Sequence, residues 1–193
     1  RRRIGLDLTG FAYVQLASAN FFSALGVVPF LGRDFLPDED QYSLRSPPVI
    51  LSYACWQNRF GADPNVVGKT FLLRPPYVEP LSGTVVGVAP AGFSGLEKSA
   101  PDFWLPAVTE AQFKKSVQVD FRLVGRLAAG VTREQATAEL NVVTHHIAEK
   151  YKGAIIPGYE NEGIFPSDLK VELRYAALGQ WGAFKSARTL QRA

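Results

Sequence analysis

Residues 61–70, GADPNVVGKT, end in the Gly-Lys-Thr triplet that closes a phosphate-binding loop. In such a loop four residues separate the first glycine from the Gly-Lys pair, so that successive backbone amides surround a phosphate. Here six residues separate Gly61 from Gly68, and Asp63 stands where a glycine is required. The spacing therefore predicts that no nucleotide binds at this segment.

The two histidines of the chain, His145 and His146, are adjacent in sequence. They fall in a stretch with helical periodicity, and neighbouring residues of a helix point about 100° apart. Two imidazoles in this arrangement cannot easily bind one metal ion together, and no carboxylate-rich cluster stands near them in sequence. We predict that both histidines are solvated helix residues.

Ser94 and the acidic run of residues 38–40 are further candidates for chemistry. The segment GFSGL lacks the spacing of a nucleophile elbow: Gly92 stands two residues before the serine, but Gly95 directly follows it, where the elbow has one residue between the serine and its second glycine. The acidic run could bind a cation weakly, but it lacks the alternating ligands of an EF-hand loop, which favours a solvated turn. The sequence predicts no catalytic residue, no cofactor-binding residue, no metal ligand and no cofactor.

Cys55 is the only cysteine, which excludes an internal disulfide and a multi-cysteine zinc site. It lies in SYACWQNRF, where Ser52 can cap a helix and where Trp56 and Phe60 form an apolar pair four residues apart. Burial of Cys55 is the favoured interpretation, and a reactive thiol is the alternative.

The charge distribution argues against a nucleic-acid partner. The chain of 193 residues has a formal net charge of +3 and is 47% hydrophobic, which is enough for one substantial core or two small subdomains. Six of its 21 cations stand at the two ends: Arg1, Arg2, Arg3, Lys185, Arg188 and Arg192. Residues 4–184 therefore carry 15 cations against 18 anions, without a basic cluster interleaved with aromatic residues.

Hydropathy and composition also indicate what kind of protein segment this chain is. No run approaches the roughly 18 to 20 apolar residues of a membrane helix, and no signal-peptide pattern is present. The sequence contains no methionine. We expect a folded domain that begins inside a longer protein.

Short strands and short helices alternate along the first hundred residues. The segment FAYVQLAS predicts a strand that leads into a helix around Phe21, and PVILS predicts a strand that leads into the helix of Trp56. GADPNVVGKTFLL and PLSGTVVGVAPAGF predict a pair of strands joined by a loop at residues 75–82. In PDFWLPAV the two prolines predict an edge strand or a connection.

The clearest single element is a helix after Thr132. Thr132 and Gln135 form a capping-box pattern, and the apolar residues that follow share one helical face. They are Ala136, Leu140, Val143, Ile147 and Tyr151. FRLVGRL before the helix and LKVELRYA after it predict strands, which together make a βαβ-type unit whose helix covers a sheet. The segment 153–167 is the expected mobile loop.

The most distinctive stretch is residues 18–35, SANFFSALGVVPFLGRDF. Ser18 can cap a helix that carries Phe21, Phe22 and Leu25, and Gly26 can end it in a left-handed turn. Arg33 is expected to be held by neighbouring acceptors at a tight turn and to fix the loop that joins two subdomains.

Together with the later motifs, this stretch resembles the MacB-like periplasmic core domain of FtsX-related ABC-type permeases. The resemblance covers residues 13–178 in the order and spacing of that family. It implies an α+β fold, a porter-like α/β sandwich interrupted by an inserted small β-rich subdomain, and it implies that Gly-Lys-Thr opens a strand. The porter-like part would comprise residues 1–17 and 117–178, the insertion 18–116, and a tail of 179–193 would lead toward a membrane helix. Only RRRIGLDLTG stands where the family has a first strand and helix, so we expect these two elements to be missing here.

The resemblance implies a non-enzymatic extracytoplasmic domain of an ABC transporter permease in the inner membrane. Such a domain transmits ATP-driven movement and contacts substrate or an adaptor protein. The implied partners are an ATPase domain or subunit reached through the membrane helices, a periplasmic adaptor and a second copy. Trp56 and Trp104 are expected to be core anchors, and Trp181 to contact the membrane interface or the rest of the permease. The alternative is a periplasmic small-molecule binding or sensor module of a membrane protein that does not transport.

Overall fold

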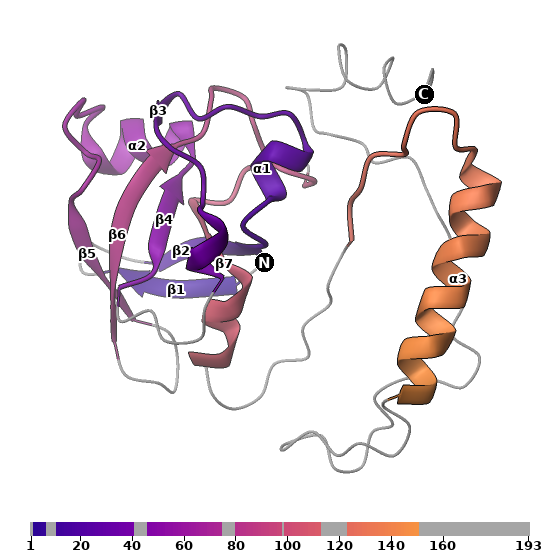
Figure 1. The fold of residues 1–193 in the computed structure, drawn as a ribbon. Coiled ribbons are helices and arrows are strands. Elements are labelled where there is room, and N and C mark those ends of the chain that lie inside the picture. Colours follow the sequence, from indigo (N-terminus) through magenta and orange to yellow (C-terminus); the bar gives the residue numbers. More distant parts are fainter. Residues whose placement is uncertain are drawn as a thin grey trace. The chain divides into compact units, whose positions relative to one another are not determined.

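The computed structural model describes residues 2–6, 11–40, 46–74, 80–97, 99–112 and 123–150. The chain forms two compact units, residues 1–114 with 177–185 and residues 115–176 with 186–193. Both units are drawn in Figure 1. The first unit contains the strands β1 (Arg2–Leu6), β2 (Phe11–Ala17), β3 (Leu31–Gly32), β4 (Pro48–Leu51), β5 (Thr70–Arg74), β6 (Leu81–Val88) and β7 (Phe103–Pro106). Its helices are α1 (Phe21–Ala24), η1 (Pro37–Glu39), α2 (Tyr53–Phe60) and η2 (Ala107–Gln112), and the second unit contains α3 (Arg133–Lys150).

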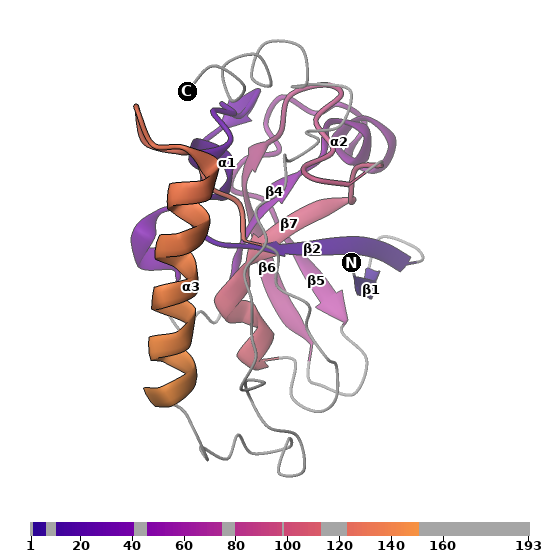
Figure 2. The same ribbon diagram turned by 90° about the vertical axis from the view of Figure 1, so that its right-hand side faces the viewer.

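The seven strands form one mixed sheet in the order β3-β6-β4-β7-β2-β1-β5. Because β5 also pairs with β6, six of these strands close on themselves and β3 is added at the outside of β6. Strands β2 and β7 are parallel, as are β4 and β6, while β4 and β7 are antiparallel. Figure 2 shows β2 beside β7. The architecture is an α+β fold built on a mixed sheet.

Two predicted strand-to-helix units are confirmed. Strand β2 occupies residues 11–17 and is followed by α1, and β4 is followed by α2. In β2 Ala12 and Val14 lie in the core while Phe11 and Tyr13 are exposed, as an amphipathic strand requires. All four residues of β4 are buried, which is typical of a strand covered on both faces.

The predicted pairing of the segments on either side of residues 75–82 is also confirmed. Strands β5 and β6 are antiparallel, with Thr70 opposite Thr84 and Leu73 opposite Leu81. A second contact joins β6 to the start of β4, since the Ser46 hydroxyl lies 2.7 Å from the Thr84 hydroxyl. The strand β1, which pairs with β2 and β5, was not predicted.

The predicted edge position of PDFWLPAV is wrong. Strand β7 lies between β4 and β2, and its four residues are buried. The prolines do not interrupt the ladder because Pro101 precedes the strand and Pro106 is its last residue. Four residues between two prolines are therefore enough for a central strand when both faces are covered.

Asp102 connects three neighbouring elements at the start of β7. Its carboxylate accepts the Tyr13 backbone N–H at 2.7 Å and lies 3.5 Å from the Arg59 guanidinium of α2. Its backbone N–H donates to the Tyr13 carbonyl at 2.7 Å, and its carbonyl accepts from Ser52 N at 2.8 Å. One residue thus fixes β2, β7 and the entry to α2 relative to one another.

The helix α2 begins and ends as its sequence predicts. The Ser52 hydroxyl accepts the Cys55 backbone N–H at 3.1 Å, which satisfies one of the unpaired donors of the first turn. Gly61, with φ +61°, ends the helix in the left-handed conformation. The capping box of α3 is confirmed too, because Thr132 and Gln135 exchange hydrogen bonds of 2.9 and 3.2 Å between side chain and backbone.

The predicted strand before α3 is wrong for the part that the structure describes. Residues 123–127 form no strand, and Leu123 is 94% exposed. A strand is stable only when it is paired, and this short segment, which includes Gly125, has no partner strand among the described residues. The strand predicted after α3, the loop 153–167, Tyr151, Trp181 and the tail 179–193 lie outside the described residues. The proposed division at residues 17/18 and 116/117 stays a prediction.

Within the described ranges, no helix has both the length and the apolar character needed to cross a lipid bilayer.

Candidate functional site

The distinctive segment of residues 18–40 begins with the short helix α1. The predicted capping by Ser18 is wrong, because α1 starts at Phe21, Asn20 precedes it, and no side chain caps it. The Ser18 hydroxyl hydrogen-bonds the Asn20 side chain at 2.7 Å instead. Gly26 has φ +70° and ends the turn in the left-handed conformation, as predicted.

Beneath this segment lies a cluster of aromatic rings. Phe22 is fully buried and packs on Trp104 of β7, on Phe35 and on Phe93, with ring centroids 5.3, 6.1 and 5.4 Å apart. The Trp104 indole N–H donates to the Gln15 side-chain oxygen at 3.0 Å, so its one polar group is satisfied. These contacts hold the segment against β2 and β7.

Gly32 brings the segment into close contact with β6. It has φ +70°, and a Cβ at this position would lie 2.1 Å from the Val86 carbonyl oxygen. The Arg33 backbone N–H donates to that same oxygen at 2.9 Å. Only glycine allows both the backbone conformation and this approach, which explains the Gly-Arg pair in the sequence.

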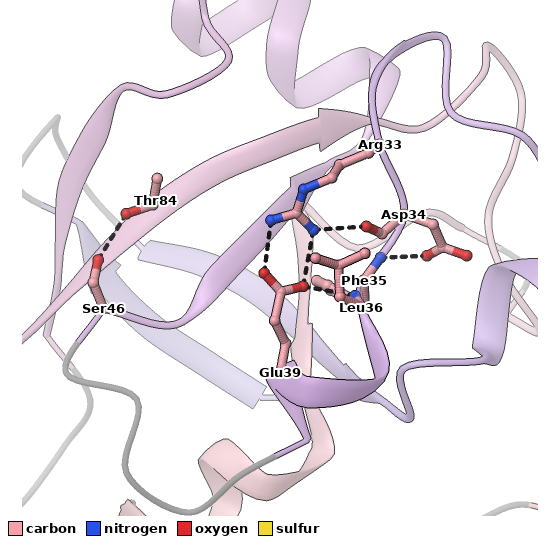
Figure 3. Close-up of polar contacts among 7 residues, drawn as sticks. All are labelled: Arg33, Asp34, Phe35, Leu36, Glu39, Ser46 and Thr84. Carbon is pink, nitrogen blue, oxygen red and sulfur yellow. Dashed lines mark hydrogen bonds and ion pairs between the residues drawn. The ribbon is translucent and has the colours of Figure 1, made fainter.

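Arg33 is held by acceptors from the next turn of chain, as Figure 3 shows. Its guanidinium binds both Glu39 carboxylate oxygens, at 2.7 and 2.9 Å, and the Asp34 carbonyl at 2.9 Å. Glu39 also accepts the Leu36 backbone N–H at 2.7 Å. The prediction that neighbouring acceptors hold Arg33 is confirmed, whereas its role between two subdomains stays a prediction.

Burial and hydrogen bonding act in opposite directions on the two acidic groups of this turn. Burial opposes ionisation of Glu39, but hydrogen bonds from Arg33 and Leu36 outweigh it and lower the pKa of Glu39. Burial raises the pKa of Asp34 despite hydrogen bonds from the Phe35 and Ser23 backbone. The hydrogen bond to Glu39 raises the pKa of Arg33.

Carboxylates of residues 33–40 also bind the backbone of residues 18–24. The Asp40 carboxylate accepts the Ala19 N–H at 3.0 Å, and the Asp34 carboxylate accepts from Ser23. The segment 38–40, predicted as a solvated turn, thus lies in and directly after the short helix η1, and its Glu39 and Asp40 are both engaged. Charge-assisted hydrogen bonds of this kind are stronger than neutral ones and fix the two halves of the segment to each other.

The Gly-Lys-Thr triplet opens β5 at Thr70, as the resemblance implies. The Lys69 ammonium forms an ion pair with Asp63, whose carboxylate also accepts the Asn65 backbone N–H at 2.9 Å. The hydrogen bond from Lys69 lowers the pKa of Asp63. The residues that suggested a phosphate loop therefore close the turn between α2 and β5.

Cys55 and Ser94 are both engaged inside the first unit. Cys55 is 3% exposed, and burial, with a smaller effect of Asp102, raises the pKa of its thiol to about 12. This confirms burial over a reactive thiol. Ser94 is buried and its hydroxyl donates to the Glu97 carbonyl at 2.7 Å.

The other expectations concern histidines and tryptophans. His145 and His146 are exposed on α3, and the described ranges contain no group of three or more His, Cys, Asp or Glu that could hold a metal ion. Trp56 is 7% exposed and Trp104 fully buried, so both are core anchors as predicted.

The sequence did not predict the hydrogen bonds that several side chains make to distant parts of the chain. Asp102 and Asp40 bind backbone groups 89 and 21 residues away, and no local pattern predicts such distant partners. The pair of hydrogen bonds between the Arg33 guanidinium and the Glu39 carboxylate, which we call the Arg33–Glu39 fork, has a local signal in the sequence. This signal is an arginine at a glycine turn, followed by a proline and an acidic run.

No protein-family model matches this chain, and no curated protein matches it. Its structure is similar to the periplasmic region of MacB from Actinobacillus actinomycetemcomitans, with a TM-score of 0.52 and 14% sequence identity over 75% of this chain. The chain spans 62% of the length of that region. A second similar structure is the extracellular domain of the noncanonic ABC-type transporter YknZ from Gram-positive bacteria, with a TM-score of 0.44, 14% identity, and coverage of 59% of this chain and 55% of that one.

The chain thus has the α+β fold of the MacB periplasmic region, in agreement with the fold that the sequence motifs imply.

Proposed function

We propose that this chain is an extracytoplasmic domain of an ABC transporter permease, anchored in the inner membrane through its parent protein. The observation that carries the proposal is the fold shared with the periplasmic region of MacB. It is supported by a sequence resemblance to the same kind of domain, which rests on residues 18–35 and the later motifs rather than on the backbone. The fold and the sequence motifs therefore support the same class of protein.

The domain is proposed to act without catalysing a reaction. The residues whose types suggested chemistry are engaged in the structure: Lys69 pairs with Asp63, and Ser94 donates to the Glu97 carbonyl. The Cys55 thiol, with its pKa raised to about 12, is protonated and buried at neutral pH. Each of these groups supports the fold instead of converging with the others on one point.

The proposed role is to carry movement from an ATPase on the cytoplasmic side to partners outside. A part that transmits movement must resist local deformation. The Arg33–Glu39 fork, the Asp40 bond to Ala19 and the ring contacts of Phe22 hold residues 18–40 on the sheet. This segment and the sheet would then move as one body, and contacts to substrate or to an adaptor protein would be made from its exposed side.

A labelling experiment in the full-length parent tests the location. Asp38 is exposed on η1, so an Asp38→Cys variant offers a reactive thiol, while the buried Cys55 serves as an internal control. In intact spheroplasts, a membrane-impermeant maleimide is expected to label Asp38→Cys and to leave the parent with Cys55 alone unlabelled. Labelling only after the membrane is broken would overturn the proposal.

A further inference from the structure

The turn that leads from α2 to β5 (Figure 1) contains the one Asp–Pro step of the sequence, Asp63–Pro64. An Asp–Pro bond is labile in acid for two reasons. The Asp carboxylate can attack its own main-chain carbonyl, which closes a five-membered ring, and the proline nitrogen is tertiary and takes up a proton more readily than an ordinary peptide nitrogen. Because the attack is intramolecular, its rate depends on how the reacting groups are held.

The carbonyl of the Asp63–Pro64 bond accepts two hydrogen bonds. The Trp56 indole N–H donates to it at 2.9 Å, and the Val66 backbone N–H donates at 3.2 Å. Trp56 is 7% exposed and Val66 is fully buried, so both donors are held in place by the packing around them. Two fixed donors on one carbonyl oxygen stabilise the negative charge that develops there when the carbonyl carbon is attacked.

The Asp63 carboxylate is held by two donors from the same turn. Its Oδ1 accepts the Asn65 backbone N–H at 2.9 Å, and its Oδ2 accepts from the Lys69 ammonium. Lys69 is the charged group that faces this carboxylate, and its hydrogen bond lowers the pKa of Asp63. The carboxylate therefore stays ionised, as a nucleophile must be, at a pH that already protonates ordinary carboxyl groups.

The backbone just before the bond is strained, and the bond itself is open to solvent. Ala62 has φ +55°, a left-handed conformation that its Cβ disfavours. A break in the chain next to this residue releases the strain. Pro64 is exposed, so solvent reaches the nitrogen that must take up a proton.

We propose that residues 61–69 form a self-cleavage site, at which the Asp63 carboxylate breaks the bond to Pro64 in acid. The event happens once on the chain itself, so it is compatible with a domain that catalyses no reaction on a substrate. Strands from the two sides of the cut pair with each other: β5 with β1, β6 with β4, and β7 with β2. The cut chain therefore keeps its sheet and loses the covalent link between α2 and β5.

Water is the only co-reactant of the step. A carboxylate oxygen of Asp63 bonds to the carbonyl carbon, and an electron pair of the C=O bond moves to the oxygen, where the two N–H donors stabilise it. The carbonyl then re-forms and the C–N bond breaks. The electron pair of that bond stays on the Pro64 nitrogen, which takes a proton from solvent. Water opens the resulting cyclic anhydride, which leaves residues 1–63 with a free carboxyl end and residues 64–193 with an amino-terminal proline.

Intact-mass spectrometry of the 193-residue chain tests the site. The folded chain is kept at about pH 4.5, near the ordinary pKa of a carboxyl group, beside a sample unfolded in urea at the same pH. We expect fragments of residues 1–63 and 64–193, whose masses sum to that of the intact chain plus one water. We expect them to form at least about tenfold faster from the folded chain, because only the fold aligns the carboxylate with the carbonyl and its donors.

Three variants separate this site from the general lability of an Asp–Pro bond. Asp63→Glu keeps the charge that pairs with Lys69 but needs a larger ring, and Pro64→Ala gives the leaving nitrogen of an ordinary peptide bond. Both are expected to remove the cleavage. Trp56→Phe keeps a buried ring and deletes the indole donor, so we expect the folded variant to be cleaved at least about tenfold more slowly. In urea this variant and the natural chain are expected to be cleaved at the same rate.

Equal rates from the folded and the unfolded natural chain would overturn the proposal. An unchanged rate in Trp56→Phe, with circular dichroism showing that it is folded, would overturn it as well, and so would a folded natural chain that stays intact or is cut at another bond. The comparison of folded and unfolded natural chain needs no variant, so it decides the question whatever the stability of Trp56→Phe. None of these outcomes bears on the location of the domain, because outside labelling of Asp38→Cys reports that separately.

Discussion

Two neighbouring parts of the segment 18–40 differ in the side chains that they expose and in how these side chains are bound. Residues 33–40 are rich in charge, and the charged groups of Arg33, Asp34, Glu39 and Asp40 are bound to each other or to the backbone, whereas Asp38 is exposed. Residues 26–31 contain no charge and leave Val28 and Phe30 largely exposed. Both parts pack on the same sheet, so the difference lies in their side chains rather than in their support.

In one part, which we call closed, the polar groups are satisfied within the chain. In the other, which we call open, apolar side chains stay exposed to water. A bidentate Arg–Glu pair with a backbone donor on the same carboxylate satisfies its own hydrogen-bonding groups and needs no partner. An exposed phenylalanine fixed by two other rings keeps apolar area in water, which burial against a partner would remove at about 25 cal/mol per Å². Residues 33–40 therefore contribute to stability through their charged groups, whereas residues 26–31 leave apolar area in water.

The largest expected effect comes from removing the shared support of both parts. Trp104→Ala deletes a fully buried indole that packs on Phe22 and Phe93, and we expect a loss of about 3–5 kcal/mol in the free energy of unfolding. Val28→Ser is the control, expected to change it by less than about 0.5 kcal/mol. Urea unfolding followed by circular dichroism measures both, and equal losses would show that Trp104 is not the support.

Glycine substitutions separate close approach from backbone conformation. Gly32→Ala is expected to cost about 3 kcal/mol, because the new Cβ meets the Val86 carbonyl oxygen and the left-handed conformation is also penalised. Gly68→Ala is a matched control, since Gly68 has φ +88° but open space around its missing Cβ. Its expected cost is about 1–2 kcal/mol. Urea unfolding measures the loss of unfolding free energy in both variants. Equal losses would show that the close approach of Gly32 to Val86 adds nothing to the cost of the backbone conformation.

Replacing the two hydrogen bonds between Arg33 and Glu39 by a single contact tests whether this ion pair stabilises residues 33–40. Arg33→Lys keeps the charge but loses the two parallel hydrogen bonds to Glu39, and we expect a loss of about 1 kcal/mol. The value is modest because the Arg33 side chain is 43% exposed and solvent screens the pair. Thermal unfolding at low and high salt is the measurement, with the larger difference expected at low salt.

The same pair predicts a pH dependence. The pKa of Glu39 is lowered from 4.5, so its stabilising contribution is complete above that value and is lost as the pH falls through the folded-state pKa. Asp34 has the opposite sign, because its pKa is raised and protonation relieves its burial. We expect the difference in unfolding free energy between the natural chain and Glu39→Gln to shrink from about pH 6 to about pH 3. A difference that stays constant over this range would show that Glu39 does not contribute through its charge.

The smallest expected effect on stability belongs to the open part. Phe30→Ser removes a ring that is 51% exposed and touches two others, so we expect a loss of about 1 kcal/mol or less. Differential scanning calorimetry checks this expectation, and a loss comparable to that of Trp104→Ala would make Phe30 a core residue.

Much of the fold was predictable because its elements carry local signals. The alternation in residues 11–17, the cap at Ser52 and the capping box at Thr132 each act within a few residues, and the structure confirms them. The opening of β5 by the Gly-Lys-Thr triplet was also expected, from the resemblance.

The errors in strand placement within the sheet arose where partner strands lie far away in sequence. The central position of β7 depends on β2 and β4 covering both of its edges, and its prolines gave the opposite local signal. Strand β1 exists because β2 and β5 pair with it. The meeting of residues 26–31, 52–56 and 89–92 could not be predicted either, since these three segments come together only after the sheet has formed.

The measurement that tests the central claim most directly is labelling of Asp38→Cys in the full-length parent by a membrane-impermeant maleimide, compared between the nucleotide-free and the vanadate-trapped transporter. If this domain lies outside the membrane and carries movement from an ATPase, intact spheroplasts should be labelled in both states, at different rates. Labelling that requires a broken membrane would contradict the location. Identical rates in the two states would contradict the claim that ATP-driven movement reaches this domain.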